Sequence, residues 1–359
     1  MPIPFQTFDP DLFARAQPLL DDEWLARDPE LAPVLPTVLA RNVGQDWHKA
    51  GTFRHHLVGV TRSLTVWQQP RDVRLLGLLH SVYGNAFVDL VKFDPASERA
   101  RLRELVGESA EHLVYLFCTQ SRTQFVQKVL GQGMEEDGSL LLDKDGTQHR
   151  LTPYEVAAFT IVSMADTIEQ WFSWQDDIYS RFPHVQAVHW AASLWPGPMR
   201  PTGRMVHQIN GLSKALKHPG LKDLLPTPPV FGHCNHHLSA ANEAAAASLY
   251  WSVIQQDQPL VDLDVATGVL ESAVRHNPWV GEPQMVLAQL YLAAGRHDDA
   301  KQAASSALHL FSAWGNSWDK RVQWDAWVAW TRILLQAAEG GPWPERLDKL
   351  NNVALRGAH

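Results

Sequence analysis

The sequence predicts an all-α protein of two helical domains. Apolar residues recur at intervals of three or four along much of the chain, which is the spacing of one face of a helix. Ala-rich helical segments return after residue 240 with a period of 34 residues. Between them a stretch rich in Pro and Gly interrupts the pattern, and 359 residues suffice for two cores. We expect a domain over residues 1–194 with its core in 40–180, a linker over 195–239 and a second domain over 240–359.

The elements of the first domain are predicted from local patterns. Prolines allow only short helices in residues 1–45. Longer helices are expected over residues 53–67, 72–82 and 99–118, and from 153 to about 174. The last begins at a capping box formed by Thr152 and Glu155. Before it, the segment SLLLDKDGTQHRL alternates around an Asp145-Gly146 turn, which predicts a small β-hairpin insertion.

Composition excludes several classes of protein. The chain is 45% apolar and 19% charged, as globular proteins are, and no run approaches the roughly 20 apolar residues of a membrane span. The N-terminus has no basic residue before Arg15 and no long apolar run, so a cytoplasmic location without a signal peptide is expected. The two cysteines, Cys118 and Cys234, fit a reducing compartment. A net charge of −8 with scattered arginines argues against nucleic-acid binding.

The second domain carries a repeat. Ala266 and Ala300 are 34 residues apart, as are Ala273 and Ala307. Together with Leu287, Ala288, Tyr291 and Gly295, these positions resemble about two tetratricopeptide repeats followed by a long helix over residues 318–338. Stacked helix pairs need small residues at close contacts and a terminal helix to cover the last apolar face. We expect the tryptophans of that helix to form this cap or a contact in a homodimer or with a protein partner: Trp318, Trp324, Trp327 and Trp330.

Three residues form a candidate metal site. His56 and His80 lie in the helices predicted to be most buried, where a histidine needs partners for both ring nitrogens. Asp166 is flanked by apolar residues, and a carboxylate is rarely left unpaired in a core. A shared metal ion would satisfy all three side chains.

These motifs resemble the HD-domain superfamily, most closely the hydrolase domain of the stringent-response RelA/SpoT proteins. The resemblance covers roughly residues 40–180 and implies a helical fold with metal ligands at His56, His80 and Asp166. The segments HLVGVTRSL and LLHSVYGNAF are also similar to an uncharacterised HD-like family. Two departures are clear. Ser81 stands where the superfamily has the Asp of its His-Asp pair, and Gly84-Asn85 replaces the acidic pair of the RelA/SpoT hydrolases, so alarmone hydrolysis is not expected.

Three functions follow from this site. Two histidines and one carboxylate resemble the facial triad of non-haem Fe(II) oxygenases, so the leading prediction is an Fe(II) oxidase or oxygenase acting on a small molecule. A Mn(II)-dependent phosphohydrolase of the HD type is the first alternative. The second is a non-catalytic binding or scaffold protein with a decayed site, acting through its C-terminal helices.

Further residues are assigned to this site as hypotheses. His48 is a candidate fourth ligand or substrate-binding group, Tyr83 a hydrogen-bond donor near the metal, and Glu169 an outer acceptor one turn from Asp166. Each could equally be a surface or capping residue. The run His233, Cys234, His236 and His237 lies in the predicted linker and matches no zinc spacing, so we expect a structural or incidental role.

Overall fold

In a computed structural model, the chain divides into two compact units. The structure describes residues 10–48, 51–84, 90–170, 203–232, 238–255 and 262–341. The N-terminal unit comprises Arg15–Gln170 and His207–Gly232, and the C-terminal unit comprises Met1–Ala14, Trp171–Val206 and His233–His359. Residues 207–232, which the sequence analysis placed in a linker, therefore belong to the N-terminal unit. Within the described part of the chain, no helix combines the length and the apolar character needed to cross a membrane.

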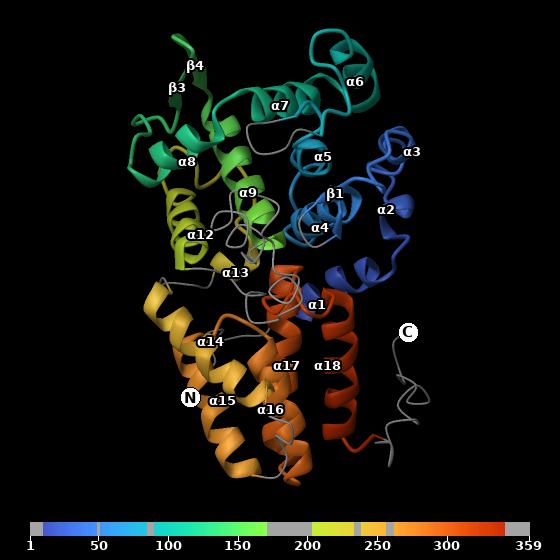
Figure 1. The fold of residues 1–359 in the computed structure, drawn as a ribbon, viewed down its shortest axis with the longest axis vertical. Helices are drawn as coiled ribbons and strands as arrows, with labels where there is room; N and C mark the ends of the chain where they lie inside the picture. The colour runs from blue at the N-terminus through green and yellow to red at the C-terminus, as the bar shows by residue number, and fades with distance from the viewer. Residues whose placement is uncertain are drawn as a thin grey trace, which may run out of the picture. The chain divides into compact units, whose positions relative to one another are not determined.

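The predicted all-α class is confirmed (Figure 1). The elements that precede the C-terminal helices are α1 (Pro10–Ala16), η1 (Gln17–Leu20), α2 (Trp24–Arg27), α3 (Leu35–Leu39), β1 (Trp47–His48), β2 (Gly51–Thr52), α4 (Phe53–Val66), α5 (Arg71–Leu79), α6 (Arg99–Val106), α7 (Glu108–Thr119), α8 (Arg122–Leu130), β3 (Leu140–Lys144), β4 (Thr147–Leu151), α9 (Pro153–Glu169), α12 (Gly203–Ala215) and α13 (Pro229–Gly232).

Three predicted helices have different limits in the structure, and one of them, expected over residues 318–338, begins only at Trp324. The helix expected over residues 72–82 ends at Leu79, and His80 is its C-cap residue. The stretch over residues 99–118 is two helices, α6 and α7, because Gly107 has φ +91° and ends the first. The predicted continuation of α9 beyond Gln170 lies outside the described residues.

The core of the N-terminal unit is formed by α4, α5, α7 and α9, which pack against one another. Helix α5 approaches α4 closely at Gly77, where a Cβ would lie 2.2 Å from Leu64 Cδ1. Helix α12 packs on this core, since Gln208 Nε2 donates to Thr167 Oγ1 of α9 at 3.1 Å. This arrangement brings the N-terminal part of α4, the end of α5 and the end of α9 together.

The predicted β-hairpin is confirmed. Strands β3 and β4 pair antiparallel from Leu140↔Leu151 to Lys144↔Thr147. Asp145 and Gly146 both have positive φ, +54° and +77°, as a two-residue type I′ turn requires. A second, very short antiparallel pair, β1 with β2, precedes α4 and was not predicted from the sequence.

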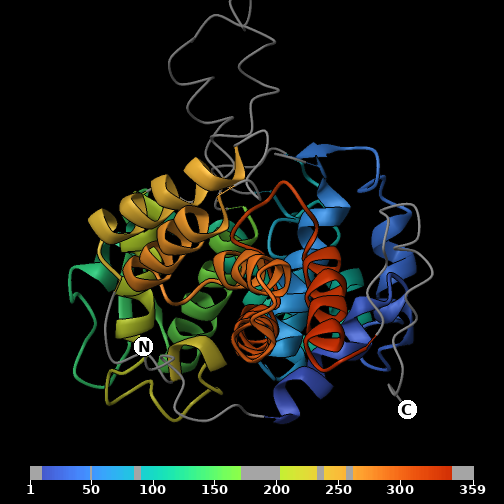
Figure 2. The same ribbon diagram turned by 90° about the horizontal axis from the view of Figure 1, so that it is seen from below.

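The C-terminal unit contains successive helices that pack side by side: α14 (Ala240–Ile254), α15 (Leu263–His276), α16 (Glu282–Ala293), α17 (His297–Trp314) and α18 (Trp324–Ala338) (Figures 1 and 2). The alanines with the 34-residue period are buried where these helices meet. The tetratricopeptide assignment itself stays a prediction. Trp318, Trp324 and Trp327 are buried within this unit, and Trp330 is half-buried.

The C-terminal unit contains a fully buried carboxyl group with a raised pKa. Glu282 is fully buried, and its Oε1 accepts the backbone N–H groups of Trp318 and Asp319 at 2.6 and 3.1 Å. Burial outweighs these hydrogen bonds and raises the pKa of Glu282 to about 8. At neutral pH this side chain is therefore held mainly as the neutral acid.

Candidate metal centre

The three predicted ligands come together in the core of the N-terminal unit. His56 lies in the second turn of α4, His80 caps the end of α5, and Asp166 lies in the last turn of α9. All three are buried, and one ligand atom from each lies within 4.8 Å of the other two. This group could hold a metal ion.

The spacing of the three ligand atoms fits a first-row divalent ion. His56 Nε2 is 3.0 Å from His80 Nε2 and 3.4 Å from Asp166 Oδ1, and His80 Nε2 is 3.8 Å from the same oxygen. A triangle with these edges has its corners about 2.0 Å from a common centre, and bonds from His nitrogen or carboxylate oxygen to such ions are about 2.0–2.2 Å long. The side chains therefore need little movement to become ligands.

The orientation of both imidazole rings is fixed by acceptors. His80 Nδ1 faces the carbonyl oxygen of Gly77 at 2.8 Å, and His56 Nδ1 faces Glu169 Oε2 at 2.5 Å. A carbonyl and a carboxylate only accept, so each Nδ1 carries a hydrogen. When both rings are neutral, the two Nε2 lone pairs face each other and Asp166 with no proton between them. Only a metal ion, or an added proton, makes this contact favourable.

Helix packing holds Glu169 over His56. A Cβ on Gly59, one turn after His56 in α4, would lie 2.8 Å from Glu169 Cγ, so a larger residue there would displace this carboxylate. The charge of Glu169 raises the pKa of His56 although burial acts in the opposite direction. The pKa of His80 is lowered to about 3, chiefly by burial. His80 is thus neutral at physiological pH, which is the form that binds metals.

Asp166 is held by two further side chains. Arg122 Nη2 donates to its Oδ2 at 2.6 Å, and Gln170 Nε2 donates to its Oδ1. Burial would raise the pKa of Asp166, but Arg122 and the two histidines outweigh it and keep this pKa below its usual range. Asp166 is therefore a carboxylate, with its Oδ1 directed at the histidines and its Oδ2 at Arg122.

The charges of this cluster do not balance while both histidines are neutral. With both histidines neutral, Asp166 and Glu169 contribute two negative charges and Arg122 one positive charge. An unbalanced charge is unfavourable in a buried site. Protonation of His56 would bring the sum to zero, and a divalent ion would bring it to plus one.

The other predicted site residues lie in different surroundings. Glu169 contacts His56, as described above. The His48 ring lies 4.6 Å from the His56 ring, centroid to centroid, and His48 is outside the group of three ligands. The Tyr83 hydroxyl donates to Glu111 Oε1 at 3.0 Å. His233, Cys234, His236 and His237 lie outside the described residues.

Arg122 is the main residue that the sequence analysis missed. It occupies the first position of α8 and lies over the Phe117 ring, with its guanidinium carbon 4.3 Å from the ring centroid. A cation at a helix N-terminus is opposed by the helix dipole, so an arginine there needs another source of stabilisation. An arginine at the first position of a helix was therefore the sequence feature that could have pointed to Arg122. Its partner across the fold, Asp166, could be found only from the structure.

Comparisons with known proteins extend the description of this region. A protein family described as a domain of unknown function (DUF6817) matches residues 37–122. The match includes His48, His56, His80 and Arg122 but ends before Asp166. Neither the curated proteins nor the solved structures contain a match to the chain.

Proposed function

We propose that the N-terminal unit is a mononuclear metal enzyme, and that it uses Fe(II) and O₂ to oxidise a small molecule. The observation that carries the proposal is the set of three ligand atoms, two imidazole nitrogens and one carboxylate oxygen, spaced for a common centre. Two histidines and one carboxylate are the protein ligands of non-haem Fe(II) oxygenases. Bound Fe(II) would supply the redox chemistry, with coordination positions left open for substrate and O₂.

The surrounding residues would act by fixing the ligands. Glu169 and the Gly77 carbonyl hold the Nδ1–H groups of His56 and His80, so that each ring presents its Nε2 lone pair. Arg122 and Gln170 hold the Asp166 carboxylate and limit it to one free direction. Ser81, in place of the HD-type aspartate, is the departure that favours one ion over the two-metal or hydrolytic sites of the superfamily that the sequence resembles.

A second candidate is a binding protein without catalysis. The Arg122–Asp166 ion pair and a protonated His56 would complete the hydrogen bonding of this core without a metal. In that case the cluster would stabilise the N-terminal unit, and the activity of the protein would lie in binding a partner through its helical C-terminal unit. This alternative predicts a protein that takes up no metal.

Anaerobic loading with Fe(II) tests the proposal. The protein should bind one Fe(II) per chain, give the electron paramagnetic resonance signal of an Fe(II)–nitric oxide complex, and consume O₂ when a substrate from a small-molecule panel is added. His80→Ala should lose all three properties, while the neighbour-matched control His55→Ala, on the exposed side of α4, should keep them. Hydrolysis of phosphate esters with Mn(II), without O₂ consumption, would instead support the phosphohydrolase.

A further inference from the structure

Strand β3 of the hairpin runs along α8, the helix that begins with Arg122. The carbonyl oxygen of Leu141 accepts from Lys128 Nζ at 2.6 Å, and the backbone N–H of Asp143 donates to Gln124 Oε1 at 2.7 Å. As residue numbers rise along β3, those of its partners fall along α8. The strand is therefore antiparallel to the helix, and the turn of the hairpin lies toward the start of α8.

These two contacts satisfy the outer edge of β3. The hairpin has a two-residue turn, so Lys144 and Thr147 form its first hydrogen-bonded pair and the backbone groups of Leu141 and Asp143 point away from β4. Such outward groups need partners. Side chains of α8 supply them, which fixes the position of the helix against the strand.

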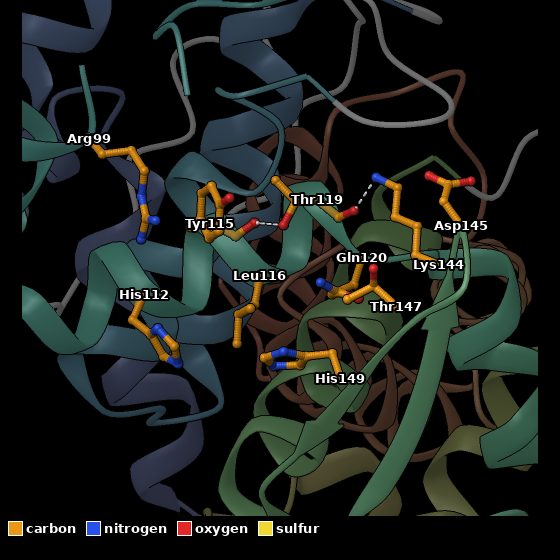
Figure 3. A pocket seen from close by; sticks show the side chains of 10 residues that line it. All are labelled: Arg99, His112, Tyr115, Leu116, Thr119, Gln120, Lys144, Asp145, Thr147 and His149. Carbon is orange, nitrogen blue, oxygen red and sulfur yellow. Dashed lines mark hydrogen bonds between the residues drawn. The ribbon is translucent and has the colours of Figure 1, made fainter. Parts of the chain in front are cut away.

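The turn end of the hairpin contacts the junction between α7 and α8. Lys144 Nζ donates to the carbonyl oxygen of Thr119 at 2.5 Å, beside the pocket drawn in Figure 3. Thr119 is the last residue of α7, where a positive charge is favourable. It lies three residues before Arg122, and Gln124 lies two residues after it. The hairpin therefore holds the chain on both sides of Arg122.

The hairpin is itself fixed to the core and to α9. Leu140, Leu142 and Leu151 are fully buried, and Leu151 is followed directly by Thr152, the N-cap of α9. The hairpin thus connects the helix that carries Arg122 with the helix that carries Asp166.

The position of Arg122 depends on the backbone that carries it. Among the described residues, its guanidinium makes one hydrogen bond, from Nη2 to Asp166 Oδ2 at 2.6 Å, and its buried Nε has no partner. An arginine side chain loses much rotamer entropy when it is ordered, and one hydrogen bond offsets little of that loss. The start of α8 must therefore be held in place for the Arg122–Asp166 contact to persist.

We propose that the β3–β4 hairpin holds Arg122 on Asp166, and that Gln124, Lys128 and Lys144 are positioning residues of the metal centre. This inference rests on the proposed function. With Arg122 on Oδ2, Asp166 directs Oδ1 at the histidines and the cluster keeps a compensating positive charge. A displaced Arg122 would leave a more negative site, so a divalent ion would bind more tightly.

A charge-neutral substitution in α8 tests this inference. Gln124→Met loses the acceptor for Asp143, and its affinity for Mn(II), measured from the electron paramagnetic resonance signal of free Mn(II), should rise about two- to tenfold, the range that loss of one hydrogen bond allows. Gln127→Met is the matched control, because Gln127 is an exposed residue of the same helix without a side-chain hydrogen bond to the described residues, and it should bind as the wild type does. In the Arg122→Met background, Gln124→Met should leave the affinity unchanged.

A second cycle needs no metal. In urea unfolding, the decrease in midpoint caused by Gln124→Met should be smaller in Arg122→Met than in the wild type, because the ion pair that the hairpin holds is already lost. Lys128→Met should behave in the same way, and Lys128→Arg, which keeps a donor for Leu141, should match the wild type.

Two outcomes would overturn the inference: equal Mn(II) affinities of Gln124→Met and Gln127→Met, or effects of Gln124→Met that are as large in Arg122→Met as in the wild type. A wild-type protein that binds no Mn(II) would instead count against the proposed function. The metal-free cycle would then decide alone whether the hairpin positions Arg122.

Discussion

Replacing Arg122 with methionine separates the structural role of the buried cluster from its role in binding a metal. Arg122 and Asp166 form an ion pair at 2.6 Å, with side chains only 15% and 9% exposed. Removing one partner of a buried pair costs about 3–5 kcal/mol, and the residual exposure of Arg122 favours the lower end. For a unit of this size, about 3 kcal/mol corresponds to a decrease in melting temperature of roughly 6–12 °C. Without Arg122, the cluster with neutral histidines carries two negative charges and no positive charge.

The same variant should therefore gain more from a divalent ion than the wild type does. Differential scanning fluorimetry with and without Mn(II) measures both effects, and Arg122→Met should show the larger metal-induced rise in melting temperature. Arg101→Met is the matched control, because Arg101 is 65% exposed and makes only a 3.6 Å ion pair with Glu98. The reasoning is refuted if Arg122→Met is no less stable than Arg101→Met, or if Mn(II) stabilises it no more than the wild type.

Three further variants test other parts of the structure. Glu169→Gln keeps an acceptor for His56 Nδ1 but loses the charge, and metal affinity measured by chelator competition should fall about 10–100-fold. An unchanged affinity would show that Glu169 does not support the metal ligands. The pKa of Glu282 is about 8 in the folded protein against an ordinary value of 4.5, so between these pH values the folded state binds a proton that the unfolded chain has lost. The free energy of unfolding should therefore fall by up to about 4–5 kcal/mol as the pH rises from 4.5 to 8. Urea unfolding should show this loss in the wild type and not in Glu282→Gln, and equal pH profiles would contradict the assignment. Gly220→Ala should lower stability by about 1–3 kcal/mol, because its Cβ would lie 2.2 Å from the Asp137 carbonyl oxygen. Gly44→Ala, with open space around its Cβ, is the control that should melt as the wild type does.

Local sequence patterns were sufficient to predict many elements of the fold. The apolar spacing of residues 53–67 predicted α4, and the Asp145-Gly146 pair predicted the hairpin turn, because both signals depend on neighbours a few residues apart. The break at Gly107 was missed, since glycine within an apolar pattern does not reveal whether its φ is positive. Packing between distant segments, such as α12 on α9, leaves no local signal.

The candidate site was predictable to a similar extent. Polar residues in apolar helices need partners, and that requirement pointed to His56, His80 and Asp166, which the structure brings together. Arg122 was missed because its partner is 44 residues away. The direction of the Tyr83 hydroxyl toward Glu111 depends on how α7 packs, which the sequence pattern does not specify.

Elemental analysis of the purified protein tests the central claim most directly. The wild type should contain about one divalent metal ion per chain, either as isolated or after anaerobic loading with Fe(II) followed by desalting. His80→Ala and Asp166→Ala should contain almost none, while His55→Ala should match the wild type. A wild-type protein that takes up no metal under either condition, or unchanged metal content in both ligand variants, would contradict the account.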